Sequence, residues 1–63
     1  MEQNNTYNLM NQITQESKSL WRIKNTYEKE ATSEELKAFW LKLAGEKEAS
    51  IVMMKAFLKS ELQ

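Results

Sequence analysis

The chain has 63 residues, and nine Lys or Arg balance nine Asp or Glu, so its formal net charge is zero. Hydrophobic residues make up 41% of it, with one Gly, no Pro, no Cys and no His. Such a chain is too apolar to be disordered and too poor in turn formers for an all-β fold. The missing Cys and His exclude zinc fingers, disulfide scaffolds, thiol nucleophiles and imidazole bases.

A first helix is predicted over about residues 6–30, preceded by residues 1–5, which we expect to be frayed. Thr6 and the two asparagines before it are suitable N-cap residues. The apolar positions then recur with the period of a helix, and Glu16 occupies the one missing position. The apolar members of this stripe are Leu9, Ile13, Leu20, Ile23 and Tyr27.

A turn at about 31–33 and a second helix at about 33–62 follow. Thr32 and Glu35 have the spacing of a capping box, in which the Thr side chain accepts from the N3 amide and the Glu side chain reaches back to the cap amide. The second helix also carries a stripe of helical period. Its members are Leu36, Phe39 or Trp40, Leu43, Lys47, Ser50, Met53 or Met54, and Phe57.

The two stripes match each other when the helices are placed antiparallel, as the short connection requires. A register with Tyr27 opposite Leu36 also places Leu20 opposite Leu43 and Leu9 opposite Met54. The same register sets Glu16 opposite Lys47, so the two charges that interrupt the stripes meet. We therefore predict an all-α fold, one antiparallel two-helix hairpin, with Glu16 and Lys47 as an ion pair that fixes its register.

One hairpin cannot cover all of its apolar side chains. The second helix contains Phe39-Trp40-Leu41 and Ile51-Val52-Met53-Met54, which point around much of its circumference. A two-helix monomer with one face wet would have almost no net stability. We therefore expect a homo-oligomer, most simply a C2 dimer, that forms a four-helix bundle. The residues predicted for an oligomer or partner interface are Trp21, Trp40, Met53, Met54 and Phe57.

The stretch 38–53, Ala-Phe-Trp-Leu-Lys-Leu-Ala-Gly-Glu-Lys-Glu-Ala-Ser-Ile-Val-Met, resembles the second helix of ferritin-like proteins of the rubrerythrin and encapsulated-ferritin type. Glu16 lies where the first helix of that family carries a metal-binding Glu. The resemblance implies hairpins that form a four-helix bundle around a di-iron centre. Here, however, the Glu and His of the family's Glu-x-x-His motif fall on Lys47 and Ser50. The resemblance therefore implies the hairpin form without the metal site or any cofactor.

Two further interpretations follow from the charged residues. Glu16, Glu46 and Glu48 could bind a hard cation through oxygen atoms alone, although Lys42 is placed to pair with Glu46. A basic face could contact RNA phosphates, as in small dimeric RNA-binding bundles, although zero net charge argues against nucleic acid. This face contains Lys18, Arg22, Asn25 and Lys29.

Gly45, in the middle of the second helix, either allows a neighbouring helix to approach closely or is a tolerated surface residue. Ser50 has no His partner, and Glu16 with Lys47 lacks the nucleophile, base and orienting group that catalysis needs. No apolar run approaches the roughly 20 residues of a membrane span, and the first residues match neither a signal peptide nor a myristoylation site. We therefore expect a cytoplasmic, non-enzymatic interaction or structural protein, with a carboxylate-only metal-binding protein and an RNA-binding bundle as alternatives.

Overall fold

The computed structural model describes residues 2–63, and this part of the chain contains helices and no strand. Helix α1 spans Glu2–Arg22, the π-helical segment η1 spans Ile23–Tyr27, and α2 spans Glu28–Glu30. After a short connection, α3 spans Glu34–Leu62. The predicted all-α class is thus confirmed. None of these helices combines the length and the apolar character that a membrane crossing would need.

The predicted element bounds differ from the structure mainly at the beginning of the chain. Helix α1 begins at Glu2 rather than at residue 6, so residues 2–5, for which fraying was predicted, are helical, and Met1 lies outside the described residues. Elements α1, η1 and α2 follow one another without a break and are called the first arm below. The second arm is α3, which begins after the connection at 31–33, where the turn was predicted.

Ser33, and not Thr32, caps the second arm. Its backbone is extended, with φ −134° and ψ 156°, and its Oγ accepts a hydrogen bond from the backbone N–H of Leu36 at 3.1 Å. The N3 residue is therefore Leu36, which has no side-chain acceptor to reach back to the cap amide. The predicted capping box of Thr32 and Glu35 is wrong by one residue, because two neighbouring hydroxyl residues can both serve as caps.

Removal of this cap should weaken α3. We expect Ser33→Ala to lower the free energy of unfolding by about 1 kcal/mol, because one amide of the first turn loses its acceptor. Thr32→Ala, one residue earlier, should change it by less than half of that. Urea unfolding followed by circular dichroism compares the two variants, and a larger loss for Thr32→Ala would contradict the assignment of the cap.

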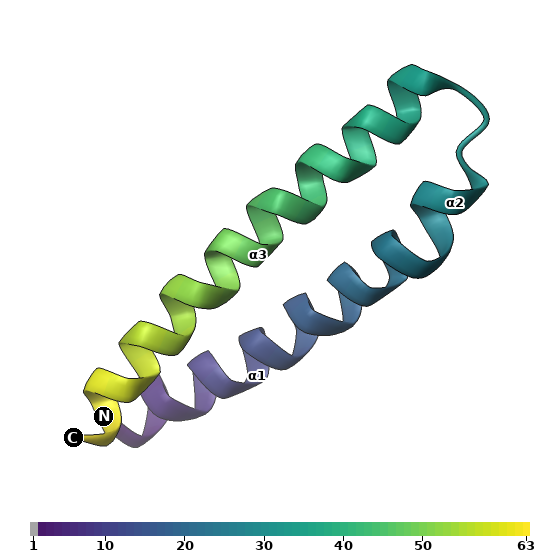
Figure 1. Cartoon of the computed structure of the whole chain (residues 1–63). Helices are drawn as coiled ribbons and strands as arrows, with labels where there is room; N and C mark the ends of the chain where they lie inside the picture. Colours follow the sequence, from purple (N-terminus) through teal and green to yellow (C-terminus); the bar gives the residue numbers. More distant parts are fainter. Residues whose placement is uncertain (1) are drawn as a thin grey trace.

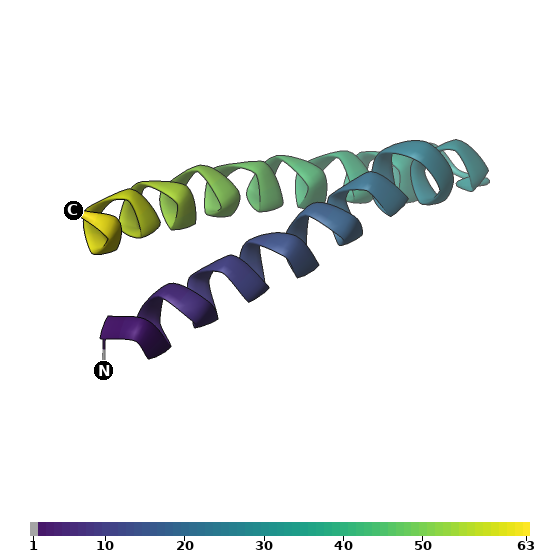
Figure 2. The ribbon, with the colours of Figure 1, turned by 90° about the horizontal axis from the view of Figure 1, so that it is seen from below.

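The two arms lie side by side and run in opposite directions, with both termini at one end and the connection at the other (Figure 1). The pair measures 45 × 14 × 14 Å. The arms overlap near the termini in Figure 1 and near the connection in Figure 2, so the two helix axes cross at an angle. This arrangement leaves two long faces, one on each side of the seam between the arms.

Few side chains are buried between the arms. Of the apolar residues that the structure describes, only Ile23, Ala44 and Ile51 are buried, with 1%, 3% and 7% of their surface exposed. Half-buried residues continue this seam along both arms at alternating steps of three and four residues. They are Leu9, Ile13, Glu16 and Leu20 on the first arm, and Trp40, Lys47, Met54 and Leu58 on the second.

The predicted stripe of the second arm is therefore only partly right. Lys47 and one member of each alternative pair, Trp40 and Met54, lie in the seam. Leu43 is half-buried, Leu36 and Ser50 are exposed, and Phe39, Met53 and Phe57 point outward with 53%, 62% and 58% of their surface exposed. Two smaller side chains that the prediction left out, Ala44 and Ile51, take the buried places next to the first arm. The row of larger side chains therefore remains at the surface.

Segment η1 widens the first arm by one turn of π-helix. The backbone N–H of Glu28 donates to the carbonyl of Ile23, a step of five residues. The side-chain amide of Asn25 donates to the carbonyl of Trp21 at 2.9 Å. At the end of this segment, the ring of Tyr27 lies 5.1 Å from that of Trp40, which makes an aromatic contact with the second arm near the connection.

Candidate functional site

The half-buried ion pair in the middle of the seam joins the two arms. Lys47 Nζ donates to Glu16 Oε1 at 2.8 Å, and Gln12 Nε2 donates to Glu16 Oε2 at 3.0 Å. The side chains of Lys47 and Glu16 are 20% and 23% exposed. The contact that the sequence register predicted is present, and both oxygens of the carboxylate are engaged.

The surroundings of Glu16 favour its charged form. The hydrogen bond from Lys47 lowers the pKa of the Glu16 carboxyl below its ordinary value of 4.5, and the charge of Lys47 and the amide of Gln12 act in the same direction. Partial burial opposes this shift and does not outweigh it. The Glu16 carboxylate is therefore charged at neutral pH, and together with Lys47 it forms a structural ion pair.

A ferritin-like di-iron centre does not fit these residues. Such a centre needs inward carboxylates and imidazoles from facing helices, and the chain has no His. The ammonium group of Lys47 lies on the carboxylate of Glu16, where it opposes a cation. Glu48 is paired with Lys24. Within residues 2–63, no three acidic side chains gather into a group that could hold a metal ion, so the predicted set of Glu16, Glu46 and Glu48 is not brought together.

The ion pair should make stability depend on pH in the acid range. The pKa of Glu16 is lower in the folded than in the unfolded chain, so its stabilisation is complete above the unfolded value near 4.5. It is lost as the pH falls through the lower, folded value. We expect the difference in unfolding free energy between the natural chain and Glu16→Gln to shrink from pH 7 to pH 3. Urea unfolding at several pH values measures this difference, and Glu30→Gln, at an exposed position that lines neither groove, is the control.

The two residues should also be energetically coupled. Either Glu16→Met or Lys47→Met alone leaves a half-buried charge without its partner and should cost about 1–3 kcal/mol. The double variant removes both charges and should unfold within about 0.5 kcal/mol of the natural chain, or above it. Additive costs in this double-mutant cycle would show that the pair makes no direct interaction.

The predicted interface residues separate into two groups. Trp21, Met53 and Phe57 are 58–62% exposed and free to contact a partner. Trp40 and Met54 are half-buried in the seam of the hairpin, and Met54 also lines both of the grooves described below. Trp40 packs against Tyr27 and, at 5.3 Å between ring centres, against Phe39.

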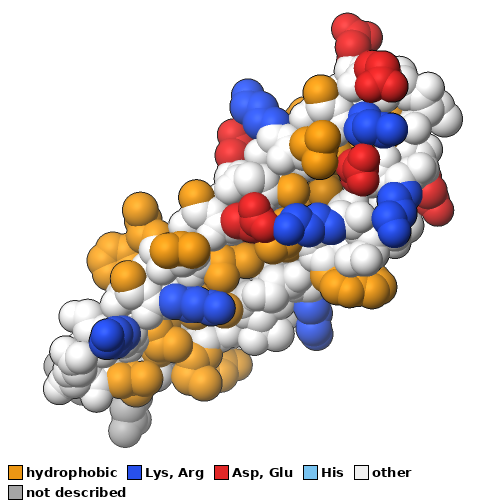
Figure 3. Space-filling view, in the orientation of Figure 1, with side chains coloured by type: hydrophobic (Ala, Val, Ile, Leu, Met, Phe, Trp, Pro, Cys, Tyr) orange, Lys and Arg blue, Asp and Glu red, His pale blue; other side chains and the backbone are white. Residues whose placement is uncertain are grey.

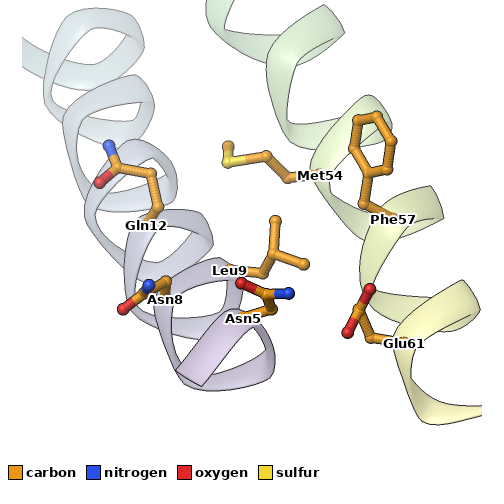
Figure 4. Close-up of a pocket in the computed structure, with 7 residues that line it drawn as sticks. All are labelled: Asn5, Asn8, Leu9, Gln12, Met54, Phe57 and Glu61. Carbon is orange, nitrogen blue, oxygen red and sulfur yellow. The ribbon is translucent and has the colours of Figure 1, made fainter. Parts of the chain in front are cut away.

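One long face, which we call the groove face, is hollowed between the arms. A groove of about 500 Å³ lies near the termini, and Figure 4 shows Leu9 and Met54 pointing into the space between the arms there. A second groove of about 370 Å³ is lined by Glu16, Ser50 and Met53 and shares side chains with the first. The residues common to both grooves are Gln12, Met54 and Phe57.

The opposite face, which we call the tryptophan face, is crossed by the exposed ion pair between Lys24 and Glu48. Trp21 precedes Lys24 by one helical turn, and Val52 follows Glu48 by one turn, so both share this face. Figure 3 shows apolar side chains among charged ones over both arms in this view. The exposed apolar residues at these helical positions are Tyr7, Met10, Trp21, Leu41 and Val52.

Two other sequence features have simple structural surroundings. Lys18, Arg22 and Lys29 of the predicted RNA-binding face are exposed, while the side chain of Asn25 is bound to the backbone of its own arm. A Cβ added at Gly45 would meet no atom within 4 Å, so close approach of the first arm does not explain this glycine.

The chain was also compared with known proteins. No protein-family model, no curated protein and no solved structure matches it.

Proposed function

We propose that the protein is a non-enzymatic helical hairpin whose role is to assemble: copies of it pair into a four-helix bundle that serves as a structural or interaction module. Its form would be that of a ferritin-like hairpin without a di-iron site. The observation that carries this proposal is the amount of apolar surface that one copy leaves uncovered.

Three of the residues whose burial is described, 4–63, are buried, whereas large apolar side chains are exposed on both long faces. The chain exposes 4994 Å² at a mass of 7.4 kDa. A compact monomer of that mass exposes about 4,200 Å². The excess of about 800 Å² is the area that each partner buries in an interface of standard size.

The polar residues near the seam also favour assembly over catalysis. The half-buried Glu16 and Lys47 neutralise each other, and Ser50, at the edge of the second groove, lies beside no imidazole because the chain has no His. An ion pair of this kind adds little net stability but sets the register of the two arms. A fixed register keeps the exposed rows of the two arms in a constant relation to each other, as a specific interface requires.

Light scattering coupled to gel filtration, over a wide range of protein concentration, tests the proposal. The expected result is a mass of two or more chains, with helicity that falls as the protein is diluted, because folding and association are linked. A folded species of 7.4 kDa at all concentrations would overturn it.

The same preparation also tests the two alternatives. Iron or manganese bound in a fixed ratio to the chain, and lost in Glu16→Ala, would support the carboxylate-only metal protein instead. A gel shift with bulk RNA that disappears steeply with added salt would support the RNA-binding bundle.

A further inference from the structure

The groove face carries a regular row of side chains along α3. Its members recur at steps of four, three, four, three and four residues, so they lie on one line of the helix. Phe57, Met53 and Ser50 line the grooves, which places this row on the groove face. The complete row is Phe39, Leu43, Glu46, Ser50, Met53 and Phe57.

This row has nearly the same chemistry from either end. An aromatic residue stands at each end, an aliphatic one comes next, and two polar ones fill the middle. In a two-fold interface, each contact between residue i and residue j occurs twice, with the roles exchanged. A helix that packs antiparallel against its own copy therefore needs a row of this symmetric kind.

We propose that the groove face is a self-complementary dimer interface, in which α3 packs antiparallel against the α3 of a second copy around a two-fold axis level with residue 48. Phe39 then faces the partner's Phe57, Leu43 faces the partner's Met53, and Glu46 faces the partner's Ser50. This proposal rests on the proposed assembly function and adds the face, the direction and the register of the pairing.

Glu46 decides the direction of the helices. In a parallel pair, Glu46 would face the same residue of the partner in the middle of the interface, and like charges placed opposite each other are destabilising. The antiparallel pair sets each Glu46 against a serine hydroxyl, which can donate a hydrogen bond to it. Glu46 and Ser50 are both exposed in the single chain, so neither is engaged by its own first arm.

In the proposed dimer, side chains of the second copy occupy the grooves. Phe57 lines both grooves, so the partner's Phe39, which faces it, lies in the larger groove, next to Leu9 and Met54. Met53 lines the second groove, and the partner's Leu43, which faces Met53, lies in that groove. The aromatic and aliphatic side chains of one copy therefore fill the hollows between the arms of the other, and the amides of Asn8 and Gln12 form the polar rim.

The tryptophan face lacks this symmetry. On α3, its row begins with Leu41 and Gly45 and ends with Lys55 and Lys59. An antiparallel copy would set lysines against the leucine end, and a parallel copy would set lysine against lysine. The groove face is thus the one of the two whose α3 row complements itself.

Disulfide trapping tests the register, and the chain suits it because it has no cysteine of its own. Leu43→Cys and Met53→Cys are made as separate variants, unfolded, mixed in equal amounts, refolded and oxidised gently. The proposal sets the thiol at position 43 of one copy beside the thiol at position 53 of the other, within the Cα separation of about 6 Å that a disulfide needs. Two copies of the same variant hold their thiols about 15 Å apart along the helix, too far to join.

The expected result is a cross-linked dimer in the mixture, in about half of the chains, and none with either variant alone. Phe39→Cys mixed with Phe57→Cys should behave in the same way and guards against a folding defect in the first pair. Val52→Cys, on the tryptophan face, is the matched control and should form no disulfide alone or in either mixture.

Each other outcome overturns part of the argument. A disulfide dimer of Leu43→Cys alone would show a parallel pairing or another register, and cross-linking through Val52→Cys would place the interface on the tryptophan face. A dimer by light scattering that no pair of cysteines traps would reject the groove-face interface and leave the assembly function standing. A folded monomer at all concentrations would overturn both.

Discussion

Replacement of Phe57 by glutamate is expected to raise the dissociation constant of the oligomer at least 100-fold. Phe57 is 58% exposed in the single chain and lines both grooves. Full burial of a large apolar side chain contributes about 1.5–3 kcal/mol, and a two-fold interface contains this residue twice. A loss of about 3 kcal/mol corresponds to a factor of about 100 in the dissociation constant. The new carboxylate, buried without a partner, adds to this cost.

The measurement is light scattering over a dilution series, with circular dichroism on the same samples. Phe57→Glu should dissociate at concentrations at which the natural chain is associated, and should lose helicity with dissociation. Val52→Glu is the matched control, because Val52 is 69% exposed on the other long face. If Phe57→Glu associates as the natural chain does, or if Val52→Glu dissociates in its place, the groove face is not the interface.

The register of the two arms could be predicted from the sequence because each apolar stripe contains one charged residue. A carboxylate and an amine each interrupted an apolar stripe, and only one antiparallel register let them meet. Glu16 and Lys47 do meet, at 2.8 Å. A charge in a seam is costly unless it is paired, so such positions carry more information about register than the leucines around them do.

The sequence did not predict which row of α3 faces the first arm. Two rows lie next to each other on this helix, one of them containing Ala44 and Ile51 and the other containing Phe39 and Phe57. Hydrophobicity alone predicts that the row with the larger side chains faces the first arm, but in the structure the row with Ala44 and Ile51 is buried there. The heptad that runs through Lys47 identifies the right row, since Ala44 precedes it by three residues and Ile51 follows it by four.

Three local features could not be predicted from the sequence: the residue that caps α3, the π-helical segment η1 and the positions of the grooves. Thr32 and Ser33 are both good caps, and which of them accepts from the first turn depends on the backbone angles of the turn. Nothing in the sequence Ile-Lys-Asn-Thr-Tyr of η1 indicates a π-helical turn. Side chains of both arms line the grooves, so the candidate interface could be defined only with both arms in place.

Ile23→Ala is expected to be the most destabilising conservative change in the interior. Ile23 is 1% exposed and is the most deeply buried of the three apolar side chains that lie in the interior among residues 4–63, the others being Ala44 and Ile51. Truncation of a buried isoleucine to alanine costs about 2–5 kcal/mol through lost burial and the cavity left behind. A small domain with so short a core has little stability to lose, so the variant should be largely unfolded at 25 °C.

Urea unfolding, at a protein concentration held well above the dissociation constant, measures this effect without a contribution from dilution. Ile23→Val should cost only about 0.5–1.5 kcal/mol, because it removes a single methyl group. Val52→Ala, on the exposed tryptophan face, should cost less still if that face stays in water. A large loss at Val52, comparable with that at Ile23, would mean that the tryptophan face is also covered in the assembly, and that the bundle contains more than two chains.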